Sequence, residues 1–318
     1  MKHKHAHCFI AILLSVAMFS TMVFTASAQV NNSFSTSQVW EPPKNFVNPV
    51  TLKIEELKLH GLTDDQITAK LTELGMGWDP KTGAKWLGRA LTSEELANMP
   101  NRMSAKSPSE LKTNIDGYTA LLQSDRKSIM RTDAASWTGV SSEVVSGSMG
   151  ISSGQTLYHY LCVQLGRLDD ASNWVETVLT HNLGEAYTWC TYDNDEGYWI
   201  IFMNKNTAIT AADNYTIMLD GTQDQYGWNY DVWINYQWAR TGHLSNLYNQ
   251  CGFQKEVYSN SGTYTSDTYH SVFYRNWLHN AQGWPYWTNS VNTWWSRVDP
   301  VQESHAMGAL SYRWETWV

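Results

Sequence analysis

The sequence lacks the short motifs that mark the commonest hydrolases and nucleotide-binding enzymes. It contains no G-x-S-x-G, no H-E-x-x-H and no G-x-x-x-x-G-K-[ST]. Its cysteines form no C-x-x-C, and the histidines from His159 onward include no pair at metal-ligand spacing. A serine, cysteine or metal-dependent hydrolase is therefore poorly supported, and we expect neither a metal nor a cofactor.

Positive charge is scarce in the second half of the chain. The net charge is −8, and the only lysines after residue 128 are Lys205 and Lys255. A chain without a basic stripe has little to hold a phosphate backbone, which argues against nucleic acid as a partner. The acidic balance suits work at low pH, where protonated carboxylates repel each other less, and it fits ordinary acidic solubility equally well.

Long apolar runs are rare, and the one at the N-terminus is typical of a secretory signal peptide. Lys2 and Lys4 precede an apolar run from Phe9 to Phe24, and Ala26-Ser27-Ala28 supplies a cleavage site. No later run is long enough to cross a bilayer. We expect residues 1–28 to be removed and the protein to be secreted, with no membrane partner.

Cysteine is also scarce, and one of the four cysteines, Cys8, would leave with the signal peptide. Cys162, Cys190 and Cys251 remain, so one thiol is left over if a pair oxidises in the exported protein. Cys190 with Cys251 is the pairing we expect. A buried, reduced trio is the alternative.

Residues 29–130 carry helical signals that the rest of the chain lacks. Capping boxes begin at Thr63 and at Thr92, and Ser107-Pro108 opens a third helix. These helices hold too few apolar residues for a core of their own, so we expect this region to pack on the second half.

In an exported hydrolase, such a region is suited to be a propeptide. Arg126, Lys127 and Arg131 would then be exposed processing sites at the junction. The alternative is an ordinary N-terminal helical domain.

From about Ser136 the hydrophobic periodicity changes to two, and the 17 Trp and 17 Tyr of the chain indicate sheets with wide aromatic faces. Short segments at near-regular spacing with no helix between them predict an all-β sandwich or jelly roll over residues 131–318. The expected strands are Ser136–Val145, Leu157–Leu168, Trp174–His181, Ala186–Asp193, Tyr198–Asn204, Tyr215–Asp220, Asn229–Gln237, Gly252–Ser259, Tyr269–Leu278 and Ala309–Trp317.

Two of these strands carry polar side chains suited to acid–base chemistry. Alternation places Gln254, Glu256 and Tyr258 on one face of their strand, and Gln164 on one face of another. A carboxylate can take a proton from water, and an unperturbed glutamate titrates near ~4.3. A side-chain amide can donate a neutral N–H to a developing oxyanion. We predict that Gln164 and Glu256 meet in one groove, where Glu256 acts on a water molecule and Gln164 stabilises the charge that develops on an attacked carbonyl.

Four motifs in the β region occur in an informative order: Trp137-Thr138-Gly139, Gln164-Leu165-Gly166, Trp174-Val175-Glu176 and Lys255-Glu256-Val257. In this order they resemble the secreted glutamic peptidases. The eqolisin type has W-x-G, Q-x-G and W-x-E followed by a late catalytic Glu. The neprosin type has a late Gly-Gly-Glu-Val before a Ser/Thr-rich stretch, and an N-terminal activation domain.

The resemblance implies a metal-independent acid endopeptidase that acts on polypeptides without a covalent intermediate. Gln164 and Glu256 would be catalytic. Trp137 and Trp174 would line the cleft, and Glu176 would orient the substrate or tune Glu256. Neprosins place a glutamate where this chain has Gln164, whereas the surroundings of Glu256 are closer to neprosins, so the subfamily and the cleavage preference stay open.

Two other functions compete with the peptidase. A non-catalytic carbohydrate-binding jelly roll would use its Trp and Tyr side chains to stack on sugar rings. A glycoside hydrolase would need two facing carboxylates, for which Glu176, Glu185 and Glu256 are candidates. The peptidase requires Gln164 and Glu256 on one face, whereas a binding module requires a row of aromatics.

Overall fold

A computed structural model describes residues 39–92, 95, 126–166, 168, 173–245, 247, 249–259 and 261–318. The chain divides into two compact units, Met1–Gln38 and Val39–Val318, and all the described residues belong to the second. The expected signal peptide and the expected helix that begins at Ser107-Pro108 lie outside the described residues. No helix among the described residues is long and apolar enough to cross a membrane.

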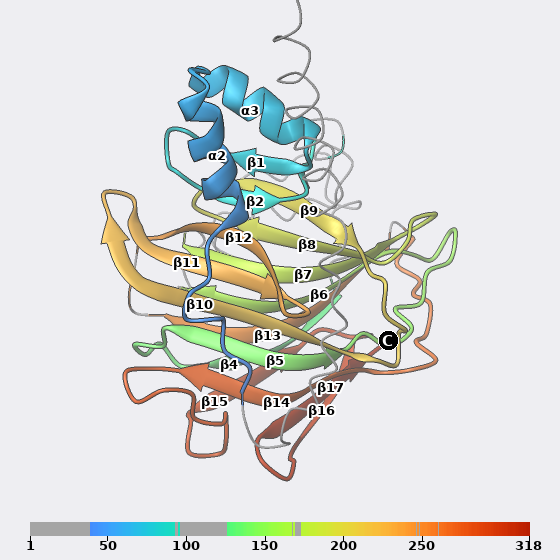
Figure 1. Cartoon of the computed structure of the whole chain (residues 1–318). Helices are drawn as coiled ribbons and strands as arrows, with labels where there is room; N and C mark the ends of the chain where they lie inside the picture. The colour runs from blue at the N-terminus through green and yellow to red at the C-terminus, as the bar shows by residue number, and fades with distance from the viewer. Residues whose placement is uncertain are drawn as a thin grey trace, which may run out of the picture. The chain divides into compact units, whose positions relative to one another are not determined.

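Two helices, α2 (Pro49–Leu59) and α3 (Asp64–Glu73), precede the β region (Figure 1). Asn48 caps α2 by accepting hydrogen bonds from the first turn, and Pro49 stands at its first position. The predicted capping box at Thr63 is confirmed, because Thr63 and Gln66 exchange side-chain and backbone hydrogen bonds at the start of α3.

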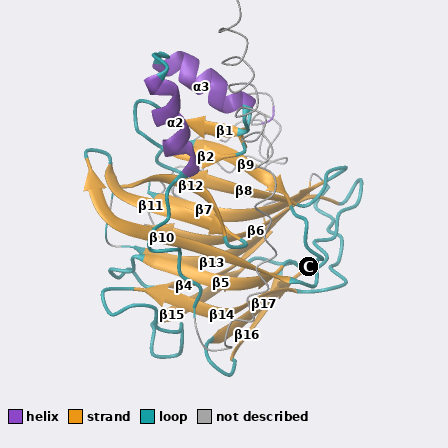
Figure 2. Cartoon of the chain, in the orientation of Figure 1, coloured by secondary structure: helices purple, strands orange, loops and turns teal. Residues whose placement is uncertain are grey.

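The remainder is almost entirely strand, as predicted, and the strands form two antiparallel sheets packed as a sandwich (Figure 2). The nine-stranded sheet has the order β1-β2-β12-β11-β10-β5-β14-β17-β16, and the eight-stranded sheet has the order β15-β4-β13-β6-β7-β8-β9-β3. The strand bounds are β1 Met76–Trp78, β2 Lys85–Leu87, β3 Arg89–Ala90, β4 Arg126–Thr132, β5 Gly139–Val145, β6 Thr156–Gly166, β7 Trp174–Asn182, β8 Thr188–Asp193, β9 Tyr198–Asn204, β10 Ala212–Asp224, β11 Gly227–Ile234, β12 Gln237–Leu244, β13 Gln250–Ser259, β14 Ser271–His279, β15 Thr293–Arg297, β16 Gln302–Met307 and β17 Tyr312–Trp317.

The main core lies between the two sheets and contains apolar side chains from both. In the eight-stranded sheet, alternate residues such as Leu161, Val163 and Phe253 enter this core. Phe253 stacks on Phe273 of the other sheet, with ring centroids 4.7 Å apart. The residues between them along β6 and β13 therefore face the opposite side of the sheet, where the candidate site is found.

The N-terminal segment joins the edges of both sheets. Strand β2 pairs with β12 in one sheet, and β3 pairs with β9 in the other. The helices pack through Val50, Ile54 and Ile67 against Trp233 and Trp238. The region expected to lean on the second half does so by sheet pairing as well as by helix packing, which covers two otherwise open strand edges.

The expected processing sites lie within strand β4, which the sequence did not predict. Arg126–Thr132 pairs with β13 on one side and β15 on the other, so the boundary at residue 130 falls inside an interior strand. Arg126, Lys127 and Arg131 are only partly accessible there. The exposure expected at this junction is therefore not observed, because hydrogen bonds on both sides of the strand hold it in the sheet.

The expected disulfide between Cys190 and Cys251 is wrong. Cys162, Cys190 and Cys251 are all free and buried. Cys190 lies on β8 and Cys251 on β13, and strands β6 and β7 separate them. Burial raises the pKa of the Cys190 thiol to about 12, so it stays protonated and is a poor nucleophile.

Candidate active site

The face of the eight-stranded sheet that points away from the main core carries polar side chains on three neighbouring strands, β7, β6 and β13. Gln164 of β6 stands opposite Glu176 of β7 on one side and Gly252 of β13 on the other. Glu256 of β13 stands opposite Tyr160 of β6. The structure thus brings Gln164, Glu176 and Glu256 to one face of the sheet.

Glu176 accepts hydrogen bonds from three side chains on this face. Its Oε1 accepts hydrogen bonds from Gln164 Nε2 at 2.6 Å and from Trp174 Nε1 at 3.0 Å. Its Oε2 accepts from the Tyr160 hydroxyl. Three donors on two strands therefore fix the orientation of the carboxylate, and the carboxylate in turn fixes the amide of Gln164.

Gln164 retains hydrogen-bonding capacity after this contact. A primary amide has two N–H groups and an acceptor oxygen, and the bond to Glu176 uses one N–H. Its Oε1 is buried and has no hydrogen-bond partner among the described residues. A Cβ built on Gly252 would lie 3.2 Å from this oxygen, so glycine leaves space where any other residue would crowd the amide.

Glu256 belongs to a second amide–carboxylate pair, formed along its own strand. Gln254 Nε2 donates to Glu256 Oε2 at 2.6 Å. Lys255, between them in sequence, points to the other side of the sheet, as predicted, and forms a buried ion pair with Asp267. The nearest lysine in the sequence is therefore not the partner of Glu256.

Gln164 and Glu256 do not stand directly opposite each other. Gln164 pairs with Gly252 and Glu256 with Tyr160, so their backbones are four residues apart along the strands, or about 13 Å. Cys162 and Gln254, which oppose each other, occupy the register position between them. The antiparallel register therefore places the two groups diagonally, with a small side chain and a second amide in between.

Aromatic side chains surround this polar face, but Trp137 is not among them. Tyr160, Tyr192 and Trp199 form a buried cluster on this side of the sheet, against which Trp174 packs. The Tyr192 and Trp199 rings stack with centroids 4.7 Å apart. Trp137, expected to line the cleft, packs against the core between the sheets.

The polar side chains are buried in the full-length chain. The exposed fractions of Gln164, Glu176 and Glu256 are 4%, 2% and 5%. Burial in a low-dielectric environment strengthens each hydrogen bond and makes unpaired groups costly, which explains why both carboxylates are bonded to amides. It also means that a polymer substrate cannot reach them in this state.

The sequence indicated which side chains share this face but missed two contacts. Alternation along each strand groups Gln254 with Glu256, and Tyr160 with Gln164. It cannot show that Gln254 bonds to Glu256, or that Tyr160 bonds to Glu176, because these contacts depend on side-chain rotamers and on the register between strands. The Gln-x-Glu spacing on one strand face was the available signal for the first of them.

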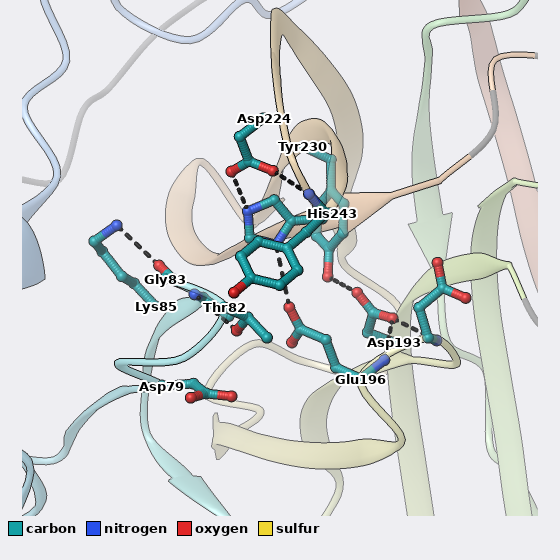
Figure 3. A network of polar contacts seen from close by, with 12 residues as sticks. Asp79, Thr82, Gly83, Lys85, Asp193, Glu196, Asp224, Tyr230 and His243 are labelled. Atoms are coloured by element: carbon teal, nitrogen blue, oxygen red, sulfur yellow. Dashed lines mark hydrogen bonds and ion pairs between the residues drawn. The ribbon is translucent and has the colours of Figure 1, made fainter.

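A second polar network lies at one end of the sandwich and joins the two sheets (Figure 3). His243 of β12 contacts Asp224 through Nε2 at 2.9 Å and Glu196 through Nδ1 at 3.6 Å. Arg240 forms an ion pair with Glu196 at 2.5 Å, and the hydroxyl of Tyr230 donates to Asp193. This network connects the β8–β9 turn to β11 and β12.

Two titratable groups of this network, Asp193 and His243, have pKa values shifted from their ordinary ones. Burial raises the pKa of Asp193 to about 7, opposed by Arg240 and reinforced by Glu196. Burial acts to lower the pKa of His243, but its contacts with Glu196 and Asp224 raise it above its ordinary value. In the described part of the chain, no three His, Cys, Asp or Glu side chains come together as metal ligands.

No protein-family model matches the chain, and no curated protein matches it in sequence. Solved structures with a similar fold include Scytalido-glutamic peptidase bound to a peptide-based transition-state analogue, at 8% identity and a TM-score of 0.41 over 61% of this chain and 98% of that one. SCP-B, a member of the eqolisin family bound to the tripeptide Ala-Ile-His, is similar at 10% identity with the same TM-score and coverage. The β-glucanase of Bacillus licheniformis is similar at 10% identity and a TM-score of 0.30, over 46% of this chain and 68% of that one. These values make no case for any activity, which has to be argued from the side chains.

Proposed function

We propose that the protein is a secreted acid endopeptidase of the glutamic type. The observation that carries this proposal is the pair of amide–carboxylate contacts on one face of three adjoining strands, Gln164 with Glu176 and Gln254 with Glu256. The order of the sequence motifs around these residues supports the same activity. The substrate would be a polypeptide, and Trp174 beside Glu176 would contribute to the wall of its binding site.

In the proposed reaction, a water molecule held between Gln164 and Glu256 attacks the scissile carbonyl carbon. Glu256 takes one proton from the water as the new C–O bond forms. The charge that develops on the carbonyl oxygen is stabilised by the N–H of Gln164 that Glu176 does not use. Protonated Glu256 then gives its proton to the amide nitrogen as the C–N bond breaks, which returns the carboxylate to its starting state.

The part of residues 29–130 that precedes β4 would serve as a propeptide region, and the burial of the polar face supports this role. The full-length chain keeps Gln164 and Glu256 away from solvent, as a proenzyme should before activation. Because β4 is an interior strand that begins at Arg126, a cut that leaves the sheet intact has to fall before it. N-terminal sequencing of the active species should therefore find a start at or before Arg126.

Digestion of acid-denatured casein tests the proposed activity. The protein without its signal peptide is incubated at about pH 3 to 5, where a glutamate base is still partly ionised, and product peptides are followed over time. We expect cleavage that resists chelators, pepstatin and serine or cysteine reagents, and that is lost in Glu256→Gln and in Gln164→Ala. Cleavage at wild-type rates by both variants would refute the site assignment.

A carbohydrate-binding or glycoside-hydrolase function would give a different result in the same preparation. The protein would then leave casein intact at every pH and would be retarded in a polysaccharide affinity gel. If Glu256 and Glu176 hydrolysed a glycan, both Glu256→Gln and Glu176→Gln would abolish the release of reducing ends.

A further inference from the structure

Gln254 occupies the register position between the two proposed catalytic residues. It lies on the same strand face of β13 as Gly252, which pairs with Gln164, and Glu256, which pairs with Tyr160. We propose that Gln254 is a positioning residue that orients the Glu256 carboxylate toward the water proposed to attack. This inference rests on the proposed function and adds a third residue to the pair that the sequence suggested.

The surroundings of Gln254 favour a hydrogen bond from its amide to Glu256. Its length of 2.6 Å is typical of a hydrogen bond to a charged group, and both side chains are buried. Gln254 stands between Cys162 of β6 and Ile129 of β4, its two register partners. With a thiol on one side and a hydrocarbon on the other, the strongest acceptor beside the amide on its own strand face is the carboxylate two residues on.

The consequence for the reaction follows from the charge of the two partners. A neutral N–H donor holds a carboxylate in place without cancelling its charge, and only an ionised carboxylate can take a proton from water. An amide also carries no charge of its own at any working pH, so its effect persists under acidic conditions, where a carboxylate neighbour would become protonated. Engaging Oε2 also fixes the plane of the carboxylate, which a positioned base requires.

The position of the amide places it beside the proposed water. A water held between Gln164 and Glu256 would lie over Cys162, the small side chain at the middle register position, and Gln254 is the residue opposite Cys162. Gln254 therefore adjoins both the base and the space in which attack would occur. A longer side chain than cysteine at position 162 would fill that space.

The test compares Gln254→Met with a matched variant, Gln250→Met. Gln250 lies on the same strand and the same face and is also buried, but its amide donates to the backbone carbonyl of Thr132, at 3.1 Å. We expect Gln254→Met to lower kcat by about tenfold with little change in KM, because the base is then less well oriented. Gln250→Met should keep both kcat and KM near the wild-type values.

A second readout does not depend on proteolysis. The Glu256 carboxylate signal is isolated as the difference between carbon-13 spectra of glutamate-labelled wild type and Glu256→Gln, and it is compared in the Gln254→Met and Gln250→Met backgrounds at one pH. We expect the signal to move in Gln254→Met, which loses the hydrogen bond, and to stay in place in Gln250→Met. Gln254→Asn, which keeps the amide but shortens the side chain, serves if the Met variant does not fold. An unchanged signal overturns the role of Gln254, whereas an absence of proteolysis by the wild type overturns the proposed function instead.

Discussion

Two buried polar regions of this protein hold their carboxylates in different ways. On the outer face of the eight-stranded sheet, amides, an indole and a phenol, which are neutral groups, donate hydrogen bonds to Glu176 and Glu256. In the network that joins the two sheets, Glu196 and Asp193 lie beside the guanidinium of Arg240.

The difference separates a region suited to chemistry from one suited to holding the fold together. A neutral donor orients a carboxylate without cancelling its charge, so the carboxylate can still gain and lose a proton. A buried ion pair instead holds both partners in place, because losing one partner leaves an uncompensated charge. Substitutions in the first region should therefore change activity, and substitutions in the second should change stability.

The largest loss of rate is expected for Gln164→Ala, and Gln250→Ala in the same sheet is its control. Gln164→Ala removes the proposed oxyanion donor, and loss of one such donor typically costs about 10²–10³ in rate. Gln250→Ala truncates a buried glutamine of the same sheet that bonds to the backbone instead. Initial rates of casein cleavage at acidic pH should fall by that factor in the first variant and by less than about threefold in the second. Equal losses in the two variants would contradict the assignment.

A smaller effect is expected when one tyrosine hydroxyl is removed from each polar region. Tyr160→Phe takes a donor from Glu176, and Tyr230→Phe takes a donor from Asp193. Both should lower the free energy of unfolding by about 2 kcal/mol, as for hydrogen bonds to charged groups. Only Tyr160→Phe should also lower kcat, by about tenfold, because Glu176 then holds Gln164 less firmly. A kcat loss in Tyr230→Phe alone would reverse the comparison.

The smallest effect concerns the pH dependence of stability in the second network. Asp193 has a folded-state pKa of about 7, above its ordinary value of 3.8, so its contribution to stability is fully present below pH 3.8 and is lost as the pH rises through about 7. Asp193→Asn removes this loss. The variant should therefore gain stability relative to the wild type as the pH rises from about 4 to about 7.

Urea denaturation of the wild type and Asp193→Asn at both pH values measures that difference. His159 serves as a contrast, because burial lowers its pKa to about 3, which makes its own contribution to stability fall as the pH drops from 6.5. A difference between the wild type and Asp193→Asn that stays constant with pH would show that Asp193 does not titrate in this range.

The fold was largely predictable because alternation is a local property. Tyr198–Asn204 was predicted to the residue, and β6, β7 and β13 were predicted within about two residues at each end. Strand β4 was missed because its basic residues suggested a processing site, although Ile129 and Met130 give it an apolar centre. Strand β12 was missed because fully buried Arg240 looks like a surface residue until Glu196 is known to be its partner.

The sequence indicated which residues share the face of the candidate site, but it did not give their relative positions. The sequence placed Gln164 and Glu256 on strands whose faces could coincide, and β6 and β13 are indeed neighbours. It could not supply the register, which sets Gly252 rather than Glu256 opposite Gln164. Nor could it place Trp137, because a tryptophan beside a strand suits a core as well as a cleft.

The most direct test of the central claim compares two carboxylates, Glu256 on the polar face and Glu143 on the nine-stranded sheet. The measurement is kcat/KM for a denatured protein substrate at about pH 4, near the ordinary titration range of a glutamate. We expect Glu256→Gln to lose about 10²–10⁴ in kcat/KM, the contribution of a general base, while Glu143→Gln keeps most of the wild-type value. Full activity in Glu256→Gln would contradict it.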